Sequence, residues 1–433
     1  MKRVVCWVFL VALWLGNSMF GYGLEGAGKE YVKIVCRGDA WSLSVAGNPL
    51  YIKGVGGANR LEVASACGAN AFRTWGGDVE SIRRSLEKAG AAHMYLMQGI
   101  ALPKDPDRYV DNDFKRKKLE EVRLLAETFK DDPALFAWGI GNEIDLDKAN
   151  IPEAWSFVEE LAKEIKKVDH NHLVATVISH KLKALELIAR YAPSLDFVGI
   201  NSYGNIFEVG KLFEDSPYRG PFIITEWGPT GWWETRKTEW GAPIEQTSEE
   251  KRIVYETRYK KAIGGNPRCL GSFVFLWGQK EERTPTWFSM FVENKVEGLP
   301  LNGEKTPMVE AMERVWTGTE PEQTAPVVGQ LTINGISFGP KVKSNTGFDV
   351  EVIAADKEGD RLTYVWEVLK EATVTATGGA YEPRPDRVGK VRTTETGNVR
   401  ISIDTPGYYR LYVYVLDHTG YVSTANIPFA VIE

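Results

Sequence analysis

Eight short apolar segments alternate with amphipathic segments between residues 51 and 316, and this alternation limits the possible folds more than any other feature. Parallel strands that are covered on both faces read as nearly continuous apolar runs. Eight of them separated by helices have the rhythm of a (β/α)8 barrel, or TIM barrel, so an α/β fold of this type is predicted. The predicted strands are residues 51–55, 70–75, 94–100, 136–142, 173–179, 197–202, 222–226 and 272–277.

The segments between these strands show helical periodicity. Apolar side chains recur at helical intervals from Leu119 to Phe129. Pro152 marks the first turn of a further helix, because proline is tolerated at that position. Residues 248–263 predict another helix before the eighth strand.

The pattern changes on both sides of the barrel. Before it, residues 31–36 and 41–45 predict a small β-hairpin, with Gly47-Asn48 as its turn. After it, a polar, proline-containing linker precedes short strands with frequent turns, which predict an immunoglobulin-like β-sandwich. The predicted boundaries are 30–316 for the hairpin and barrel, 317–326 for the linker and 327–433 for the sandwich.

The first 23 residues read as a secretory signal peptide. Lys2 and Arg3 precede an apolar stretch, residues 4–15, that is short for a membrane span. Cys6 lies inside this stretch rather than after it, which argues against a lipoprotein anchor. The chain is therefore predicted to be secreted, periplasmic or on the cell surface, with an uncleaved membrane anchor as the alternative.

Charge and cysteine content exclude several classes of function. The formal net charge is -6, so binding to nucleic acid or to an anionic membrane through bulk electrostatics is not expected. Three of the four cysteines remain after the predicted signal. They are too far apart for a disulfide framework or a zinc site, although one disulfide stays open. The mature chain is predicted to be a monomer with no membrane span, no metal and no organic cofactor.

Two glutamates lie at the ends of apolar segments. Glu143 ends the string WGIGNE, residues 138–143, and Glu226 lies in the string ITEWG, residues 224–228. Side chains at the C-terminal ends of barrel strands four and seven point into one mouth. Two carboxyl groups about 5–5.5 Å apart are the catalytic pair of retaining glycoside hydrolases, so this separation is predicted for Glu143 and Glu226.

Other polar residues end predicted strands and could support the pair. Arg73 ends strand two and offers a cation that can keep a neighbouring carboxylate ionised, with a purely structural ion pair as the alternative. Gln98 and His180 end strands three and five and could reach hydroxyl groups of a substrate.

The ordered set of strand ends resembles the clan A retaining glycoside hydrolases over roughly residues 40–316. The resemblance implies that Glu143 is the acid/base, that the preceding Asn142 binds the sugar 2-hydroxyl and that Glu226 is the nucleophile. It also implies supporting roles on strands two, six and eight for Arg73, Tyr203 and Trp277. A cap over the barrel mouth is the alternative for Tyr203.

Within the clan, the strings IKGV, FRTW and WGIGNE resemble the barrels of families 2 and 5. They occupy residues 52–55, 72–75 and 138–143. A bare barrel followed by an immunoglobulin-like domain, without the large N-terminal sandwiches typical of family 2, looks most like glycoside hydrolase family 158. That resemblance implies an endo-β-1,3-glucanase.

Tryptophans gather after predicted strands seven and eight. Flat aromatic rings beside a catalytic mouth suit the faces of pyranose rings, and aromatic core packing is the alternative for each of them. At least two of these five are expected to stack on sugar: Trp227, Trp232, Trp233, Trp240 and Trp287.

These residues together predict a retaining, endo-acting β-glycoside hydrolase of polysaccharide or oligosaccharide, with laminarin-type β-1,3-glucan as the substrate. β-1,4-Glucanase, β-mannanase, exo-β-glycosidase or transglycosylase activity on the same scaffold stays open, and so does a non-catalytic carbohydrate-binding barrel. The segment 228–248 could leave the cleft open or block it. The C-terminal domain is expected to support the barrel rather than to bind glycan.

Overall fold

The structure is a computed structural model that describes residues 31–293, 296–374 and 381–433. The predicted signal peptide, residues 1–23, lies outside these ranges. Within them, no helix combines the length and the hydropathy that crossing a bilayer requires.

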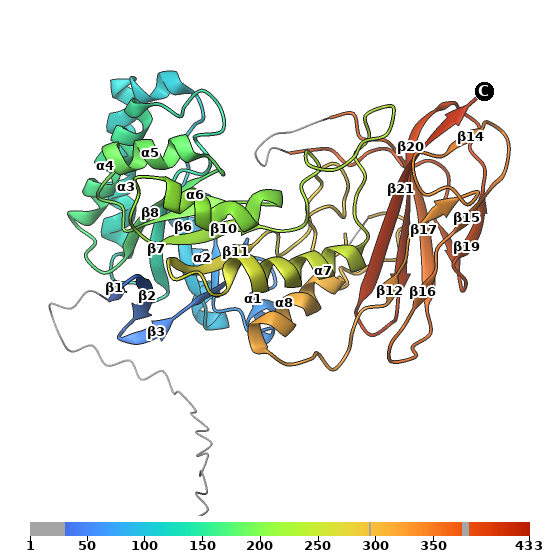
Figure 1. The fold of residues 1–433 in the computed structure, drawn as a ribbon, viewed down its shortest axis with the longest axis horizontal. Helices are drawn as coiled ribbons and strands as arrows, with labels where there is room; N and C mark the ends of the chain where they lie inside the picture. The colour runs from blue at the N-terminus through green and yellow to red at the C-terminus, as the bar shows by residue number, and fades with distance from the viewer. Residues whose placement is uncertain (1–30, 294–295, 375–380) are drawn as a thin grey trace, which may run out of the picture.

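A closed barrel of eight parallel strands forms the first part of the molecule, and its strands follow one another in chain order (Figure 1). The prediction of a (β/α)8 barrel is therefore confirmed. Most strand side chains are buried, as expected when helices cover the outside and side chains fill the inside. The strands are β4 (Ile52–Gly56), β5 (Ala71–Arg73), β6 (Tyr95–Ile100), β7 (Leu135–Ile140), β8 (Leu173–Ile178), β9 (Phe197–Asn201), β10 (Phe222–Trp227) and β11 (Cys269–Val274).

Helices connect the strands and cover the barrel. Helix α7 begins with a capping box, in which the Thr247 side chain and the Glu250 side chain each accept the other's backbone N–H. The helices are α1 (Leu61–Ala66), α2 (Val79–Ala92), α3 (Asn112–Phe129), α4 (Pro152–Lys166), α5 (Leu182–Tyr191), α6 (Val209–Asp215), α7 (Ser248–Arg258) and α8 (Pro307–Thr317). Three short helices join them: η1 (Pro106–Tyr109), η2 (Gly204–Glu208) and the π-helical η3 (Tyr259–Ile263).

The eighth strand lies three residues earlier than predicted, at Cys269–Val274 instead of 272–277. Strand β11 pairs with β4 from Gly271 to Val274 and then leaves the sheet. The apolar run continues beyond this point, so hydrophobicity alone did not mark the end of the strand. Trp277 consequently follows the strand rather than ending it.

A three-stranded sheet precedes the barrel, formed by β1 (Val32–Arg37), β2 (Ala40–Val45) and β3 (Asn48–Leu50). The predicted hairpin is present, but its turn lies at Gly38-Asp39, and the turn at Ala46-Gly47 leads into β3. Its apolar side chains join a core cluster with barrel side chains, namely Val32, Leu43 and Val45 with Ile52, Phe136 and Phe273.

The C-terminal part consists of β-sheets that share one apolar core (Figure 1). A five-stranded sheet has the order β14-β21-β20-β17-β18, a three-stranded sheet the order β13-β15-β19, and β12 pairs with β16. The immunoglobulin-like assignment and the domain boundaries stay predictions. The strands are β12 (Val327–Val328), β13 (Thr332–Ile333), β14 (Lys341–Lys343), β15 (Phe348–Glu351), β16 (Ala354–Ala355), β17 (Thr363–Lys370), β18 (Arg392–Thr394), β19 (Asn398–Ile401), β20 (Gly407–Leu416) and β21 (Val422–Ile432).

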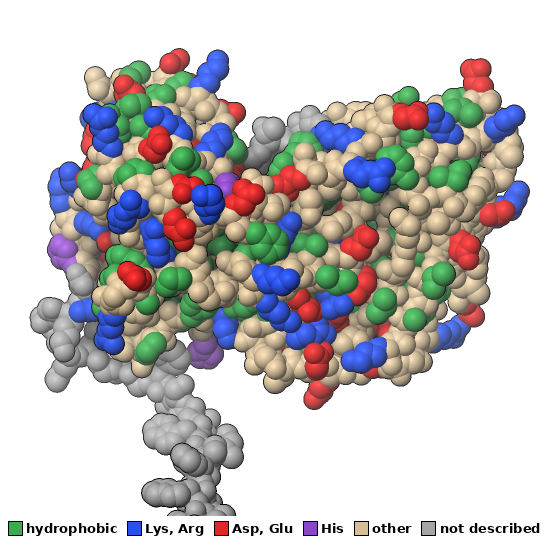
Figure 2. All heavy atoms as spheres, viewed as in Figure 1, with side chains coloured by type: hydrophobic (Ala, Val, Ile, Leu, Met, Phe, Trp, Pro, Cys, Tyr) green, Lys and Arg blue, Asp and Glu red, His purple; other side chains and the backbone are tan. Residues whose placement is uncertain are grey.

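A buried polar network joins the two parts. Glu245 and Lys251 form an ion pair at 2.5 Å in which both side chains are 1% exposed. Asn426 on β21 donates to Glu245 at 2.6 Å, and the Thr424 backbone N–H donates to Ser248 Oγ at 2.8 Å. Figure 2 shows the outline hollowed between the barrel and the C-terminal sheets, and charges of both signs are mixed over this face.

Candidate active site

The two predicted glutamates lie at the end of the barrel where the C-terminal ends of its strands meet. Glu226 is the last residue but one of β10, and Glu143 follows the end of β7 by three positions. Both side chains are largely buried, with 10% of Glu226 and 14% of Glu143 exposed. Both line a single cavity of about 840 Å³.

The backbone around Glu143 adopts an unusual conformation that fixes its side chain. Gly141 and Glu143 have positive φ angles of 74° and 51°. The Glu143 N–H donates to Val177 O at 2.9 Å, and Asp145 accepts a hydrogen bond from the Ser179 N–H at 3.0 Å. A left-handed non-glycine residue costs roughly 1–3 kcal/mol and persists only where its surroundings enforce it. These bonds tie the Glu143 turn to β8 and the residue after it.

A buried guanidinium connects the two glutamates. Arg73 at the end of β5 lies 3.4 Å from Glu226 Oε1 and donates to Asn142 Oδ1 at 2.9 Å. Asn201 at the end of β9 donates to Glu143 Oε1 at 3.1 Å and contacts Arg73 through its Oδ1. Side chains from three barrel strands, β5, β9 and β10, and from the turn after β7 therefore form one network.

Glu226 is surrounded by donors. Besides the Arg73 guanidinium, Trp75 Nε1 donates to Glu226 Oε1 at 2.7 Å and the Tyr203 hydroxyl to Oε2 at 3.4 Å. Charge-assisted hydrogen bonds of this kind suit a carboxylate, which accepts and does not donate. This environment is suited to a nucleophile.

Glu143 has a different environment. Burial, followed by the nearby Glu226 carboxylate, raises the pKa of Glu143 to about 7, against the opposing effects of Asn201 and of Lys104, whose Nζ lies 3.9 Å away. A carboxyl group that holds its proton near neutral pH can donate it in catalysis. The two glutamates therefore differ in the way that an acid and a nucleophile must.

Aromatic rings form one wall of the cavity. Trp233 stacks against Phe288, and Trp232 meets Trp233 edge to face at 5.5 Å. His180, which was predicted to reach substrate, lines the cavity and contacts Ser202 Oγ at 3.0 Å, and burial lowers its pKa. The aromatic lining residues are Trp75, Tyr203, Trp232, Trp233, Phe275 and Phe288.

Three of the predicted substrate-stacking or supporting tryptophans are buried away from this cavity. Trp227 packs against Tyr255, Trp277 donates its Nε1–H to Arg60 O, and Trp287 donates to Thr230 O. None is more than 1% exposed, so these indoles form core and cannot stack on a sugar in this structure. Trp240 also lies elsewhere and stacks on Tyr408 of the C-terminal sheet.

Gln98 is also displaced from its predicted role. It is 1% exposed, its Nε2 donates to Gly99 O and its Oε1 accepts from Thr74 Oγ1 at 2.9 Å. Its polar atoms are thus used within the barrel, and it does not line the cavity. Of the other predicted site residues, Asn142, Tyr203 and Trp232 line the cavity, and Arg73 lies beside Glu226 beneath it.

The cavity contains functional candidates that were not assigned from the sequence. Trp75 lies two positions after Arg73, and the period of two along an extended chain would have placed it on the same side. Asn201 ends β9, so its place at a strand end was a usable signal. Lys104 and Lys280 come from loops, where the sequence pattern gives no direction.

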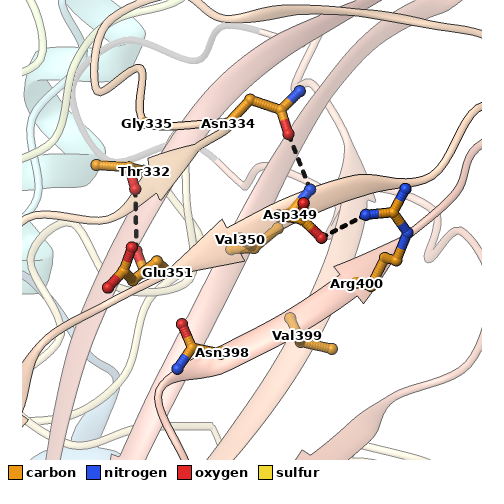
Figure 3. A pocket seen from close by; sticks show the side chains of 9 residues that line it. All are labelled: Thr332, Asn334, Gly335, Asp349, Val350, Glu351, Asn398, Val399 and Arg400. Carbon is orange, nitrogen blue, oxygen red and sulfur yellow. Dashed lines mark hydrogen bonds and ion pairs between the residues drawn. The ribbon is translucent and has the colours of Figure 1, made fainter.

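A second concavity of about 520 Å³ lies on the three-stranded sheet of the C-terminal part (Figure 3). Its polar groups pair with one another: Arg400 bonds to Asp349 at 2.6 Å, and Asn334 Oδ1 accepts the Asp349 N–H. Among residues 31–293, 296–374 and 381–433, no aromatic ring lines it. The arrangement is that of a solvated sheet face.

Comparison with known proteins supports the fold. No family model matches the chain. It is 27% identical over 203 residues to mannan endo-1,4-beta-mannosidase 4 of rice, Oryza sativa subsp. japonica, which covers 38% of this chain and 42% of that protein. It is 26% identical over 186 residues to putative mannan endo-1,4-beta-mannosidase 9 of the same plant, covering 35% and 44%. The chain thus spans less than half the length of these curated relatives.

Solved structures give a similar result. A calcium-binding mutant of Bacteroides uniformis beta-glucuronidase 2 matches with a TM-score of 0.50 and 13% identity, over 93% of this chain and 48% of that one. Saccharomyces cerevisiae Gas2p in complex with laminaritetraose and laminaripentaose matches with a TM-score of 0.47 and 17% identity, over 68% of each chain. At such identities only the fold is informative. The chain has a glycoside hydrolase-like (β/α)8 barrel.

Proposed function

We propose that this protein is a retaining β-glycoside hydrolase that acts on polysaccharide or oligosaccharide. The observation that carries the proposal is the pair of glutamates in one cavity with opposite environments, Glu226 surrounded by donors and Glu143 with a pKa raised to about 7. Glycoside hydrolysis with retention needs one carboxylate and one carboxylic acid at the same bond.

In this mechanism Glu226 attacks the anomeric carbon while Glu143 gives its proton to the leaving glycosidic oxygen. The products of this step are a covalent glycosyl-enzyme ester and a free alcohol. Glu143, now a carboxylate, takes a proton from water as the water attacks the same carbon, and Glu226 leaves with its bonding electrons. Arg73 and Asn142 hold the groups around the reacting centre.

Laminarin-type β-1,3-glucan, cleaved internally, is the substrate we propose first, because of the resemblance to family 158. β-1,4-Mannan is the second candidate, and the sequence similarity to two rice mannosidases favours it. The aromatic wall of the cavity suits the flat faces of either chain. The proposed location is outside the cytoplasm, on the strength of the leader-like residues 1–23.

The decisive experiment uses ¹H NMR to determine which anomer of the product forms first from laminarin and from β-mannan. The β-anomer is expected first, and the α-anomer would contradict the mechanism. Glu226→Ala with azide should yield the α-glycosyl azide, and Glu143→Ala the β-glycosyl azide. The matched control is Glu121→Ala on the exposed face of α3, which should behave like wild type.

A further inference from the structure

Trp232, in the aromatic wall of the cavity, is held from three sides. Its Nε1–H donates to Glu282 Oε1 at 3.1 Å. The guanidinium carbon of Arg283 lies 4.4 Å from the centre of its ring, within the range of a cation–π contact. Trp233 meets it edge to face. The orientation of this indole therefore depends on the two residues that follow Glu281.

Arg283 itself is held by the C-terminal part of the molecule. Its backbone is left-handed, with a φ angle of 65° that a side-chain-bearing residue rarely adopts. Its N–H donates to Glu382 Oε2 at 2.7 Å, and its guanidinium donates to Val374 O at 3.3 Å. Glu382 is 3% exposed, so this bond is shielded from water.

The same C-terminal part holds both loops that carry the aromatic wall. In the loop after β10, residues 228–247, Glu245 accepts a bond from Asn426. In the loop after β11, Glu293 pairs with Arg384 at 2.9 Å. Neither contact involves a residue next to the cavity. Glu382, by contrast, bonds to Arg283, which follows the lining residue Glu282.

We infer that Glu382 is a positioning residue of the cleft, which fixes the Arg283 backbone and thereby holds the Arg283 guanidinium on the Trp232 ring. A sugar that stacks on Trp232 would then be bound by a ring whose orientation is set by the C-terminal domain. This inference rests on the proposed function, because it assigns Trp232 to substrate binding. It gives the C-terminal domain a role in affinity rather than in chemistry.

Steady-state kinetics on the polysaccharide substrate provide the first test. Glu382→Ala removes the acceptor of the Arg283 N–H and is expected to raise KM about three- to tenfold with kcat within about twofold, the signature of lost uniform binding. Glu382→Gln keeps an acceptor oxygen and should retain the wild-type KM. Glu395→Ala, in an exposed ion pair of the same domain, is the control and should change neither parameter.

The indole N–H NMR signal of Trp232, assigned by its loss in Trp232→Phe, provides a test without catalysis. It should move in Glu382→Ala and return in Glu382→Gln. If wild type cleaves no glycoside and the signal still moves, the proposed function fails while the positioning role stands.

An unmoved Trp232 signal in folded Glu382→Ala overturns the inference, and so does an equal shift in Glu395→Ala. If Glu382→Ala does not fold, Arg283→Gln takes its place. That variant keeps the backbone N–H but removes the cation from the ring, so an unmoved signal there also overturns the inference.

Discussion

Glu143 and Glu226 carry the same functional group, and their surroundings differ at every contact. Glu226 receives bonds from Trp75 and Tyr203 and lies beside Arg73. Among the described neutral side chains, only Asn201 donates a hydrogen bond to Glu143. The Lys104 ammonium lies 3.9 Å from Glu143. Burial and the neighbouring carboxylate favour the protonated form of Glu143.

The pH dependence of activity follows from the Glu143 proton. With its pKa raised to about 7, the acid form is present below pH 7 and is lost as the pH rises through that value. The kcat/KM of the wild type is therefore expected to fall on the alkaline side with a midpoint near 7. Because the two carboxyl groups interact, this midpoint belongs to the pair.

Lys104→Gln is the matched variant for this prediction. Lys104 favours the charged form of Glu143, so its removal should raise the pKa of Glu143 and move the alkaline limb to higher pH. A limb that moves to lower pH, or does not move, would contradict the assignment of Glu143 as the acid. The pH profiles of both proteins on one aryl β-glycoside provide the measurement.

At the residue scale the sequence located the charged residues at or just after strand ends, but it could not separate cavity tryptophans from core tryptophans. Glu143, Glu226 and Arg73 are placed by strand ends, whose direction in a barrel is fixed. Trp227, Trp277 and Trp287 lie at or beyond the ends of β10 and β11, and nothing in composition tells a buried indole from one in the cleft. Only tertiary packing decides between them.

The turn from β7 to Glu143 is the element that positions the proposed acid. Gly141 has a φ angle of 74°, and a Cβ there would approach Ile144 Cγ2 to 3.2 Å. Gly141→Ala is therefore expected to destabilise the fold by about 1–2 kcal/mol, because L-residues disfavour this conformation. It should also lower kcat through displacement of Glu143. Urea unfolding and kinetics measure the two effects.

Gly90 in α2 is the control glycine. It has ordinary helical φ, and a Cβ there meets no atom within 4 Å. Gly90→Ala should stabilise the protein by about 0.5–1 kcal/mol, since alanine loses less backbone entropy in a helix, and leave kcat unchanged. A similar loss of stability in both variants would show that the positive φ angle of Gly141 is not the cause of the loss.

Strand and helix positions were predictable where apolar runs have clear ends. Helix α4 begins at Pro152 as predicted. Proline has no backbone N–H, and the N–H groups of the first helical turn have no partner within the helix. Strand β11 was misplaced because Phe275, Leu276 and Trp277 extend the apolar run after the strand has left the sheet. Phe275 and Leu276 line the cavity and Trp277 packs in the barrel core, so their apolar character does not reflect strand pairing.

At the scale of the whole molecule, the contact between barrel and C-terminal sheets contains an unpaired acid. Both side-chain oxygens of Glu281 are buried, and neither has a hydrogen-bond partner among the residues that the structure describes. Burial and the nearby Glu293 raise the pKa of Glu281 to about 9, although Arg384 opposes them. Glu382 and Glu245 add further negative charge.

Stability should therefore fall as the pH rises. Above its ordinary value of 4.5 the unfolded chain releases the Glu281 proton, while the folded protein keeps it up to about pH 9. Over this window Glu281 lowers the free energy of unfolding by at most about 1.4 kcal/mol per pH unit. Glu281→Gln should flatten this decline, as measured by urea unfolding at pH 5, 7 and 9. If the stability of variant and wild type changes in parallel with pH, Glu281 is not the cause of the decline.

The arrangement of the two parts was the least predictable property. The sequence indicated a linker and a separate β-domain. Both predictions rest on patterns of residues that are close together in the chain. The contacts of Asn426 with Glu245 and of Glu382 with Arg283 join residues 181 and 99 positions apart. Periodicity carries no information about such pairs, so the sequence favoured a supporting role for the C-terminal domain but could not indicate the residues that make the contacts.

The contacts of β21 have a consequence for the order in which the protein is completed during synthesis. Thr424 and Asn426 satisfy groups of Ser248 and Glu245 that leave the ribosome 176 and 181 residues earlier. Chains fold in parts as they emerge, so the barrel strands can assemble while those polar groups still face water. In the nascent protein the barrel then forms first. The contacts that support the loop after β10, which carries part of the aromatic wall, form last.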